Sequence, residues 1–194
     1  SDKSLSILHK VAATVHLIQS GYSFALTNTK FKDSGLYNIT NGNNFVSQHY
    51  RLGNVVGVFP LMAAIDHAWS AVDSKHYLAF VEKGYNPARW LEYSGSAGIM
   101  FFVIAQLSEI KDIKLLSVLL GGNAVLQYIG YTNERNTADE NIREANSGNI
   151  VGFGLFATLW LPIFTSFFTA ISESDESVPN VVYSIIFVMF ALFI

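Results

Sequence analysis

The chain has 194 residues, of which 51% are hydrophobic and only 14% are charged, whereas a soluble domain of this size carries charges at roughly a quarter of its positions. This composition excludes an ordinary water-soluble domain and indicates long apolar segments that face lipid or one another. The net charge of −3, with no cluster of Lys and Arg, argues against nucleic-acid binding, and the absence of cysteine excludes disulfides and thiolate metal sites.

Five segments are apolar enough to cross a bilayer, for which a helix needs about 20 residues. We expect spans near residues 5–27, 54–72, 87–108, 113–133 and 149–172. No small-residue cleavage site follows the first segment, so it reads as a span and not as a removable signal peptide. A sixth span begins at Val178-Pro179 and continues from Val181 to Ile194 without a stop signal. Residues 1–194 are therefore expected to form a single transmembrane bundle domain, a fragment whose last helix is incomplete.

The long connection between the first two spans carries a hairpin signal. Asn41-Gly42 separates two stretches between Leu36 and Tyr50, and Asn-Gly between such stretches favours a tight β-turn. If the N-terminus is cytoplasmic, seven Lys and Arg residues of the connections lie inside and five outside, which weakly favours that orientation. The first long loop, with its β-hairpin, is then external.

The third segment carries the most informative polar residues. Arg89, Glu92, Ser96, Met100 and Val103 follow one another at spacings of three or four, so they share one helix face. An ionisable group at the centre of a span costs about 2.5–3.5 kcal/mol, which makes each one a functional candidate. Two interpretations stay open: an interfacial pair between Arg89 and Glu92, or a buried Glu92 carboxylate that faces a cation on another helix.

The string from Ala88 to Ser94, followed by small residues and Met100, resembles the third helix of microbial rhodopsins, and its glutamate and serine-rich continuation resemble the heliorhodopsin family. Other stretches agree in order and spacing: Val15 to Gln19, His67, Gly122 to Ala124, Trp160, and Val178-Pro179 followed by Val182-Tyr183. The resemblance covers essentially the whole chain and is strongest in the third span. It implies an all-α membrane protein, a seven-transmembrane rhodopsin-like bundle with six spans present here, a cytoplasmic N-terminus and a homodimer.

The resemblance also implies a cofactor, all-trans retinal, held as a Schiff base on a lysine of the seventh helix. That lysine is not in this chain, because all eight Lys residues lie in the N-terminal segment, loops or span edges. By resemblance Glu92 is the Schiff-base counterion, and its network and the retinal pocket are drawn from polar and aromatic positions on the other spans. The network comprises Arg89, Ser96, His16, Gln19 and His67, and the pocket comprises Tyr93, Met100, Asn123, Gln127, Phe156, Trp160 and Phe190.

Each assignment has a plainer alternative. The histidines can be packing residues hydrogen-bonded to backbone or water instead of proton relays, and the remaining histidines, His9, His49 and His76, are expected to be solvated. Aromatic stripes at helical spacing, such as Phe156 and Trp160, usually serve packing.

The function implied by the resemblance is a light sensor that isomerises retinal with local proton transfer. Proton-pumping relatives carry a second carboxylate about three turns beyond the counterion, where this chain has Val103, so no efficient pumping is expected. The alternatives are a light-driven or light-gated proton transporter on the same fold, which a buried Asp66 would favour, and an unrelated membrane protein. We expect lipid and an unknown signalling protein as partners, no metal, and no enzymatic activity, because hydrolase, phosphate-loop and nucleophile motifs are absent.

Overall fold

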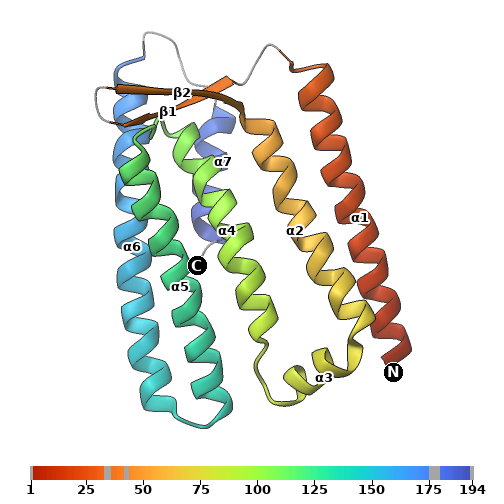
Figure 1. Cartoon of the computed structure of the whole chain (residues 1–194). Helices are drawn as coiled ribbons and strands as arrows, with labels where there is room; N and C mark the ends of the chain where they lie inside the picture. The colour runs from red at the N-terminus through yellow and green to blue at the C-terminus, as the bar shows by residue number, and fades with distance from the viewer. Residues whose placement is uncertain (1, 33–35, 42–43, 175–179, 193–194) are drawn as a thin grey trace.

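The computed structural model describes residues 2–32, 36–41, 44–174 and 180–192, and it is built of long helices with two short strands at one end (Figure 1). The long helices run up and down, and α1 packs against α2, α2 against α4, α4 against α5, and α5 against α6. Each of the five predicted spans coincides with a long helix. The elements are α1 (Asp2–Thr29), β1 (Leu36–Asn41), β2 (Asn44–Arg51), α2 (Leu52–Val72), α3 (Ser74–Glu82), α4 (Pro87–Leu107), α5 (Ile113–Ala138), α6 (Ile142–Ser172) and α7 (Asn180–Leu192).

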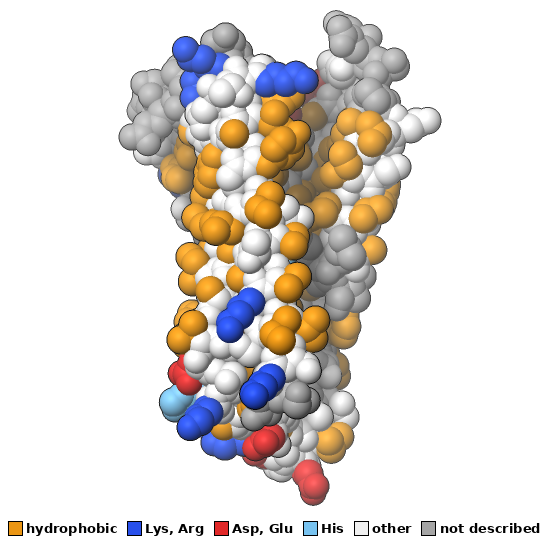
Figure 2. Space-filling view, turned by 90° about the vertical axis from the view of Figure 1, so that its right-hand side faces the viewer, with side chains coloured by type: hydrophobic (Ala, Val, Ile, Leu, Met, Phe, Trp, Pro, Cys, Tyr) orange, Lys and Arg blue, Asp and Glu red, His pale blue; other side chains and the backbone are white. Residues whose placement is uncertain are grey.

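Three of the described helices are long and apolar enough to cross a membrane, namely α2, α5 and α6, and a shorter apolar helix covers Asn180–Ala191. Large hydrophobic side chains such as Leu8 and Ile18 on α1 are about two-thirds exposed. On the α1 side of the molecule, hydrophobic side chains are spread over the stretch between the two ends, and Lys and Arg side chains lie at one end and in the lower part of the face (Figure 2). Lipid is the surrounding in which such an apolar exterior is stable.

The structure corrects the predicted boundaries at the end of the bundle where the N-terminus lies. The connection after α2, for which no helix was predicted, contains α3. Helix α5 continues past residue 133 to Ala138, and α6 already begins at Ile142. Hydropathy marks where a helix leaves the apolar region, but the backbone hydrogen bonds of α5 and α6 continue through polar residues into the turn. Val178-Pro179, the predicted opening of the sixth span, lies outside the described residues, and α7 is described from Asn180.

A two-stranded antiparallel sheet covers the opposite end of the bundle. Strands β1 and β2 pair from Leu36 with Arg51 to Asn41 with Asn44, while Gly42 of the predicted turn lies outside the described residues. The Thr40 amide donates to the carbonyl oxygen of Lys111 at 2.9 Å, and Tyr50 contacts Phe102 with ring centroids 5.7 Å apart. The sheet is therefore attached to the ends of α4 and α5 as well as to the chain between α1 and α2.

Two kinds of helix contact hold the bundle together. The contact of α1 with α2 uses small and hydroxyl residues: the Ser20 hydroxyl donates to the Gly57 carbonyl at 2.8 Å, and a Cβ on Gly53 would lie 2.3 Å from the Thr27 hydroxyl oxygen. Such close backbone approach is typical of helices in lipid. Helices α4 to α7 instead share a core of large side chains. Its buried members are Phe101, Ile104, Ala105, Ile110, Leu116, Leu119, Phe156, Leu159, Trp160, Ile163, Phe167 and Ile186.

Candidate functional site

The start of α4 is fixed by its own sequence. Pro87 occupies the first turn, where its missing amide hydrogen costs nothing, and the Asn86 side chain accepts hydrogen bonds from the amides of Ala88 and Arg89 at 3.1 and 3.3 Å. This cap sets the helical phase of α4. As a result, Glu92 lies about one turn further along the helix.

Glu92 is half-buried, and its carboxylate is hydrogen-bonded to the side chain of Ser96. The charged or titratable side chains that act on it are Asp66 from α2 and His16 from α1. Within the described part of the chain, Glu92 forms no ion pair with any Lys or Arg. A carboxylate in a span without a cation is an expensive arrangement, which makes it the most informative feature of the site.

Arg89 does not pair with Glu92, and the interpretation of the two as a local ion pair is wrong. The Arg89 guanidinium donates to Glu134 on α5, with an Nη2–Oε1 distance of 2.6 Å. The Trp90 indole donates to the other oxygen of Glu134, and the Asn86 amide donates to that same oxygen at 3.4 Å. Glu134 was missed because the predicted span ended at residue 133. The sequence did contain a signal for this pair. The third and fourth spans are antiparallel neighbours, so Glu134 at the end of the fourth span lies at the same height in the bundle as Arg89 at the start of the third.

Three histidines lie together between α1 and α2. His9 and His67 are joined through their Nδ1 atoms at 3.0 Å, and the rings of His16 and His67 stack with centroids 5.5 Å apart. His16 also bonds Gln19 at 2.9 Å. The expectation that His9 is solvated is therefore wrong. His76 is exposed, as expected, and pairs with Asp73.

Asp66 belongs with this group. It acts electrostatically on His67, His9 and Glu92. The structure thus brings Glu92, Ser96, His16, Gln19 and His67 into one polar region, and it places Arg89 elsewhere, on Glu134.

The aromatic residues form a second group, toward the α6 and α7 side. The ring centroids of Phe190 lie 5.2 Å from those of both Phe156 and Trp160. Trp160 is 1% exposed and also meets Phe101 edge-on at 5.5 Å. Phe101 was missed in the sequence because neighbouring Met100, and not Phe101, fell on the face shared with Glu92.

Asn123 is completely buried on α5, and neither polar atom of its amide has a hydrogen-bond partner among the described residues. It faces α4 at Gly98, where an added Cβ would lie 3.8 Å from the Asn123 nitrogen. Such a group in a native protein calls for an explanation, and a bound ligand or water can supply one. Met100 on α4 is partly buried.

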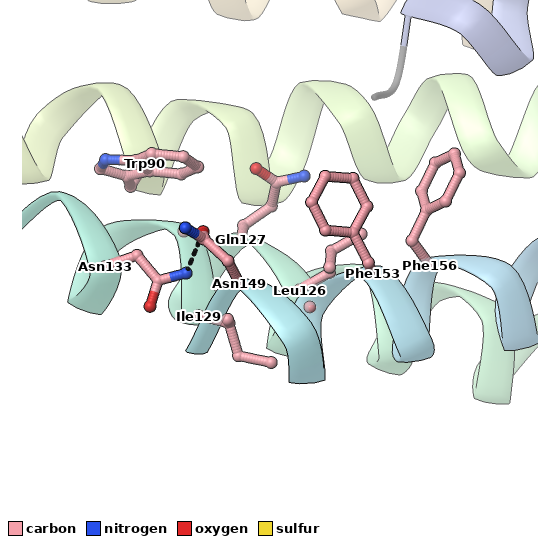
Figure 3. Close-up of a pocket in the computed structure, with 10 residues that line it drawn as sticks. Trp90, Leu126, Gln127, Ile129, Asn133, Asn149, Phe153 and Phe156 are labelled. Atoms are coloured by element: carbon pink, nitrogen blue, oxygen red, sulfur yellow. Dashed lines mark hydrogen bonds between the residues drawn. The ribbon is translucent and has the colours of Figure 1, made fainter. Parts of the chain in front are cut away.

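A pocket of about 180 Å³ opens between α5 and α6, with Trp90 of α4 at one end and Phe156 at the other (Figure 3). Gln127 lines it, and Asn133 bonds Asn149 across it at 2.9 Å. Tyr93 is 42% exposed and its ring meets Trp90 at 6.0 Å.

The expected pocket residues are therefore divided. Phe156, Trp160 and Phe190 lie in the aromatic group, Gln127 and Phe156 line the pocket between α5 and α6, and Tyr93 lies at the start of α4. Met100 and Asn123 belong to none of these places.

In a comparison with protein families, the family model described as Heliorhodopsin matches residues 3–194. A search among curated proteins gives no match. The match covers nearly the whole chain and confirms the family resemblance found in the sequence.

Proposed function

Because the chain belongs to the heliorhodopsin family, we propose that it is a retinal-binding light sensor in which Glu92 is the counterion of a protonated Schiff base. Family membership and the apolar helices support a retinal-type rhodopsin that is an integral membrane protein. The observation that carries the assignment of Glu92 is that this half-buried carboxylate has no cation among the described residues, since Arg89 is bound to Glu134. A buried Schiff-base cation would supply the missing charge.

The residues present suit retinal. An apolar polyene needs aromatic and small walls, and Phe156, Trp160 and Phe190 provide the former while Gly98 beside Asn123 provides the latter. Seven of the eight lysines lie at the ends of helices or in connections, and Lys10 lies in the third turn of α1. We therefore propose that the lysine that binds retinal comes from a span outside this sequence. Once bound as all-trans Schiff base, retinal would supply absorption of visible light and isomerisation.

The side chains around Glu92 suit local proton transfer. Ser96 orients the carboxylate, and His16, stacked on His67, leads from it to the pair of His67 and His9. A histidine can accept or pass on a proton near neutral pH. Val103 offers no carboxylate further along α4, so we propose a sensor without efficient ion pumping.

A light-driven or light-gated proton transporter is the second candidate, and one observation favours it. Asp66 lies among the histidines and near Glu92, which would extend a chain of proton-accepting groups toward the end of the bundle where α3 lies. Light-induced pH changes in a suspension of cells that express the full-length protein separate the two candidates. A sensor leaves the external pH unchanged, whereas a transporter shifts it.

Further features follow from the family. We propose a seven-span bundle with a cytoplasmic N-terminus, which places α3 and the α5–α6 turn inside and the β1–β2 sheet outside. The excess of Lys and Arg on the side assigned to the cytoplasm, seven against five, supports this orientation. A homodimer and a signalling partner are further parts of the proposal.

The retinal assignment is tested by adding all-trans retinal to the full-length protein and recording its absorption spectrum. The proposal expects a visible band that disappears with hydroxylamine, because hydroxylamine cleaves a Schiff base. No visible band, or a band that resists hydroxylamine in light, would contradict covalent retinal binding.

A further inference from the structure

At the start of α4, two carboxylates are candidate partners for the Arg89 guanidinium: Glu92 on the same helix and Glu134 on α5. Arg89 and Glu92 are three residues apart on α4, and side chains at this spacing are neighbours on a helix surface. In isolation the two would pair. In the structure the Arg89 guanidinium turns to α5 and binds Glu134 instead.

Three donors converge on Glu134. Its Oε1 accepts a hydrogen bond from the Arg89 guanidinium, and its Oε2 accepts hydrogen bonds from the Trp90 indole and from the backbone N–H of Asn86. Its side chain is 22% exposed, against 41% for that of Arg89. A carboxylate such as Glu134 that accepts several hydrogen bonds in a partly buried position binds a guanidinium more strongly than a carboxylate that forms a single ion pair.

Packing also directs Arg89 toward α5. The guanidinium carbon lies 5.3 Å from the centroid of the Trp90 ring, a cation–π geometry. That ring lies directly against Gly130 of α5, where an added Cβ would come within 2.2 Å of it. Trp90 and Glu134 therefore fix Arg89 from two sides.

We propose that Glu134 is a positioning residue that holds Arg89 away from Glu92 and so leaves the Glu92 charge to a cation in the bundle. This inference rests on the proposed function for the identity of that cation. The other groups that act on Glu92 are Ser96 on its own helix, His16 from α1 and Asp66 from α2. Arg89 is three residues from Glu92 on the same helix, and its guanidinium stays charged at all physiological pH values.

The first experiment uses the full-length protein with retinal and measures the Schiff-base pKa by pH titration of the visible band. The substitution Glu134→Gln should free Arg89 to pair with Glu92. Because Glu92 would then stabilise the protonated Schiff base less, the Schiff-base pKa should fall by about one unit or more, since an opposite charge at close range shifts a pKa by about 1–3 units. The visible band should also move to longer wavelength. In the double variant Arg89→Gln, Glu134→Gln no competitor is left, so both properties should return to near the wild-type values.

Asp139→Asn is the matched control, because it removes a carboxylate directly after α5 that pairs with an arginine, Arg135, at an exposed site. It should leave the band and its pKa unchanged. A double variant as perturbed as Glu134→Gln alone would show that lost packing, and not a freed Arg89, causes the effect. An unchanged Glu134→Gln protein would overturn the proposal directly.

The second experiment needs no retinal. Double-mutant cycles of Arg89→Gln and Glu92→Gln are measured by unfolding the retinal-free protein in detergent. In the wild-type background the two effects should add. In the Glu134→Gln background they should couple by roughly 1.4- to 2.3-fold in the unfolding equilibrium, the size of an ion pair at this helical spacing. Coupling in the wild-type background, or none in the Glu134→Gln background, would refute the proposal. If the wild-type protein forms no visible band, the proposed function fails while this cycle still decides the role of Glu134.

Discussion

The contact of Trp90 with Gly130 allows a sharp test of how α4 is held on α5. Glycine in a helix interior is less favourable than alanine by roughly 0.5–1 kcal/mol, so Gly→Ala should stabilise α5 wherever space allows. At Gly130 the new Cβ would lie 2.2 Å from the Trp90 ring, and at Gly121 on the same helix nothing lies within 4 Å. The two substitutions are chemically identical but meet different surroundings.

The difference between the two variants isolates the steric cost. Trp90 cannot yield freely, because its indole nitrogen is hydrogen-bonded to Glu134. Overpacking of this kind costs about 1–3 kcal/mol, whereas the gain in helix propensity is common to both variants. Gly130→Ala should therefore be less stable than Gly121→Ala by about 1–3 kcal/mol, which is about 5- to 150-fold in the unfolding equilibrium.

The assay is denaturant unfolding in detergent, followed by the loss of helical circular dichroism. Tryptophan fluorescence should report a changed environment of Trp90 in Gly130→Ala alone. Equal stability of the two variants would refute the packing of Trp90 against Gly130 and, with it, the fixed direction of Arg89.

Three further predictions concern other parts of the molecule. Ser20→Ala removes the hydrogen bond to the Gly57 carbonyl between α1 and α2 and should cost about 0.5–1.5 kcal/mol in the same unfolding assay. In the control Ser117→Ala, the lost hydroxyl is exposed and donates to the Ile113 carbonyl of its own helix, so stability should change by less than about 0.5 kcal/mol. Burial, with a smaller contribution from Tyr37, raises the pKa of the Tyr50 phenol on β2, so its stabilising effect is complete below about pH 10 and is lost as the pH rises above that value. Ultraviolet titration should show one late tyrosine that is absent from Tyr50→Phe, and an early titration of all tyrosines would contradict the burial. Illumination of cells that express the full-length protein should leave the external pH unchanged, and a light-dependent shift would favour the transporter.

The sequence predicted the parts of the fold that depend on composition and local pattern. Long apolar segments predicted the helices, and the predicted start of the third span at residue 87 agrees with the observed start of α4 at Pro87. Polar extensions carry no such signal, which is why the ends of α5 and α6 were misplaced and α3 was missed.

Pairings between distant residues were the weakest part of the sequence-based account. Spacing along one helix predicted Arg89 with Glu92, whereas Glu134, a carboxylate 45 residues away in the chain, binds Arg89 in the structure. His9 was assigned to solvent because it lies near the start of the chain, and its partner His67 is likewise remote in sequence. The geometry of a bundle decides such pairs, and a single helix does not contain that information.

Only some of the residues that the family resemblance grouped together lie close to one another in the structure. Phe156, Trp160 and Phe190 lie in mutual contact, and His16 stacks on His67 and acts electrostatically on Glu92. Tyr93 is instead directed toward Trp90 at the start of α4. Its role beside retinal stays a prediction.

The measurement closest to the central claim is the absorption spectrum of the full-length protein with retinal when Glu92 is replaced by Gln. Glu144→Gln, at an exposed site on α6, provides the control for loss of a carboxylate. If Glu92 balances the Schiff-base charge, Glu92→Gln alone should move the visible band to longer wavelength or lower the Schiff-base pKa. A Glu92→Gln protein with the wild-type band and the wild-type pKa would contradict the account.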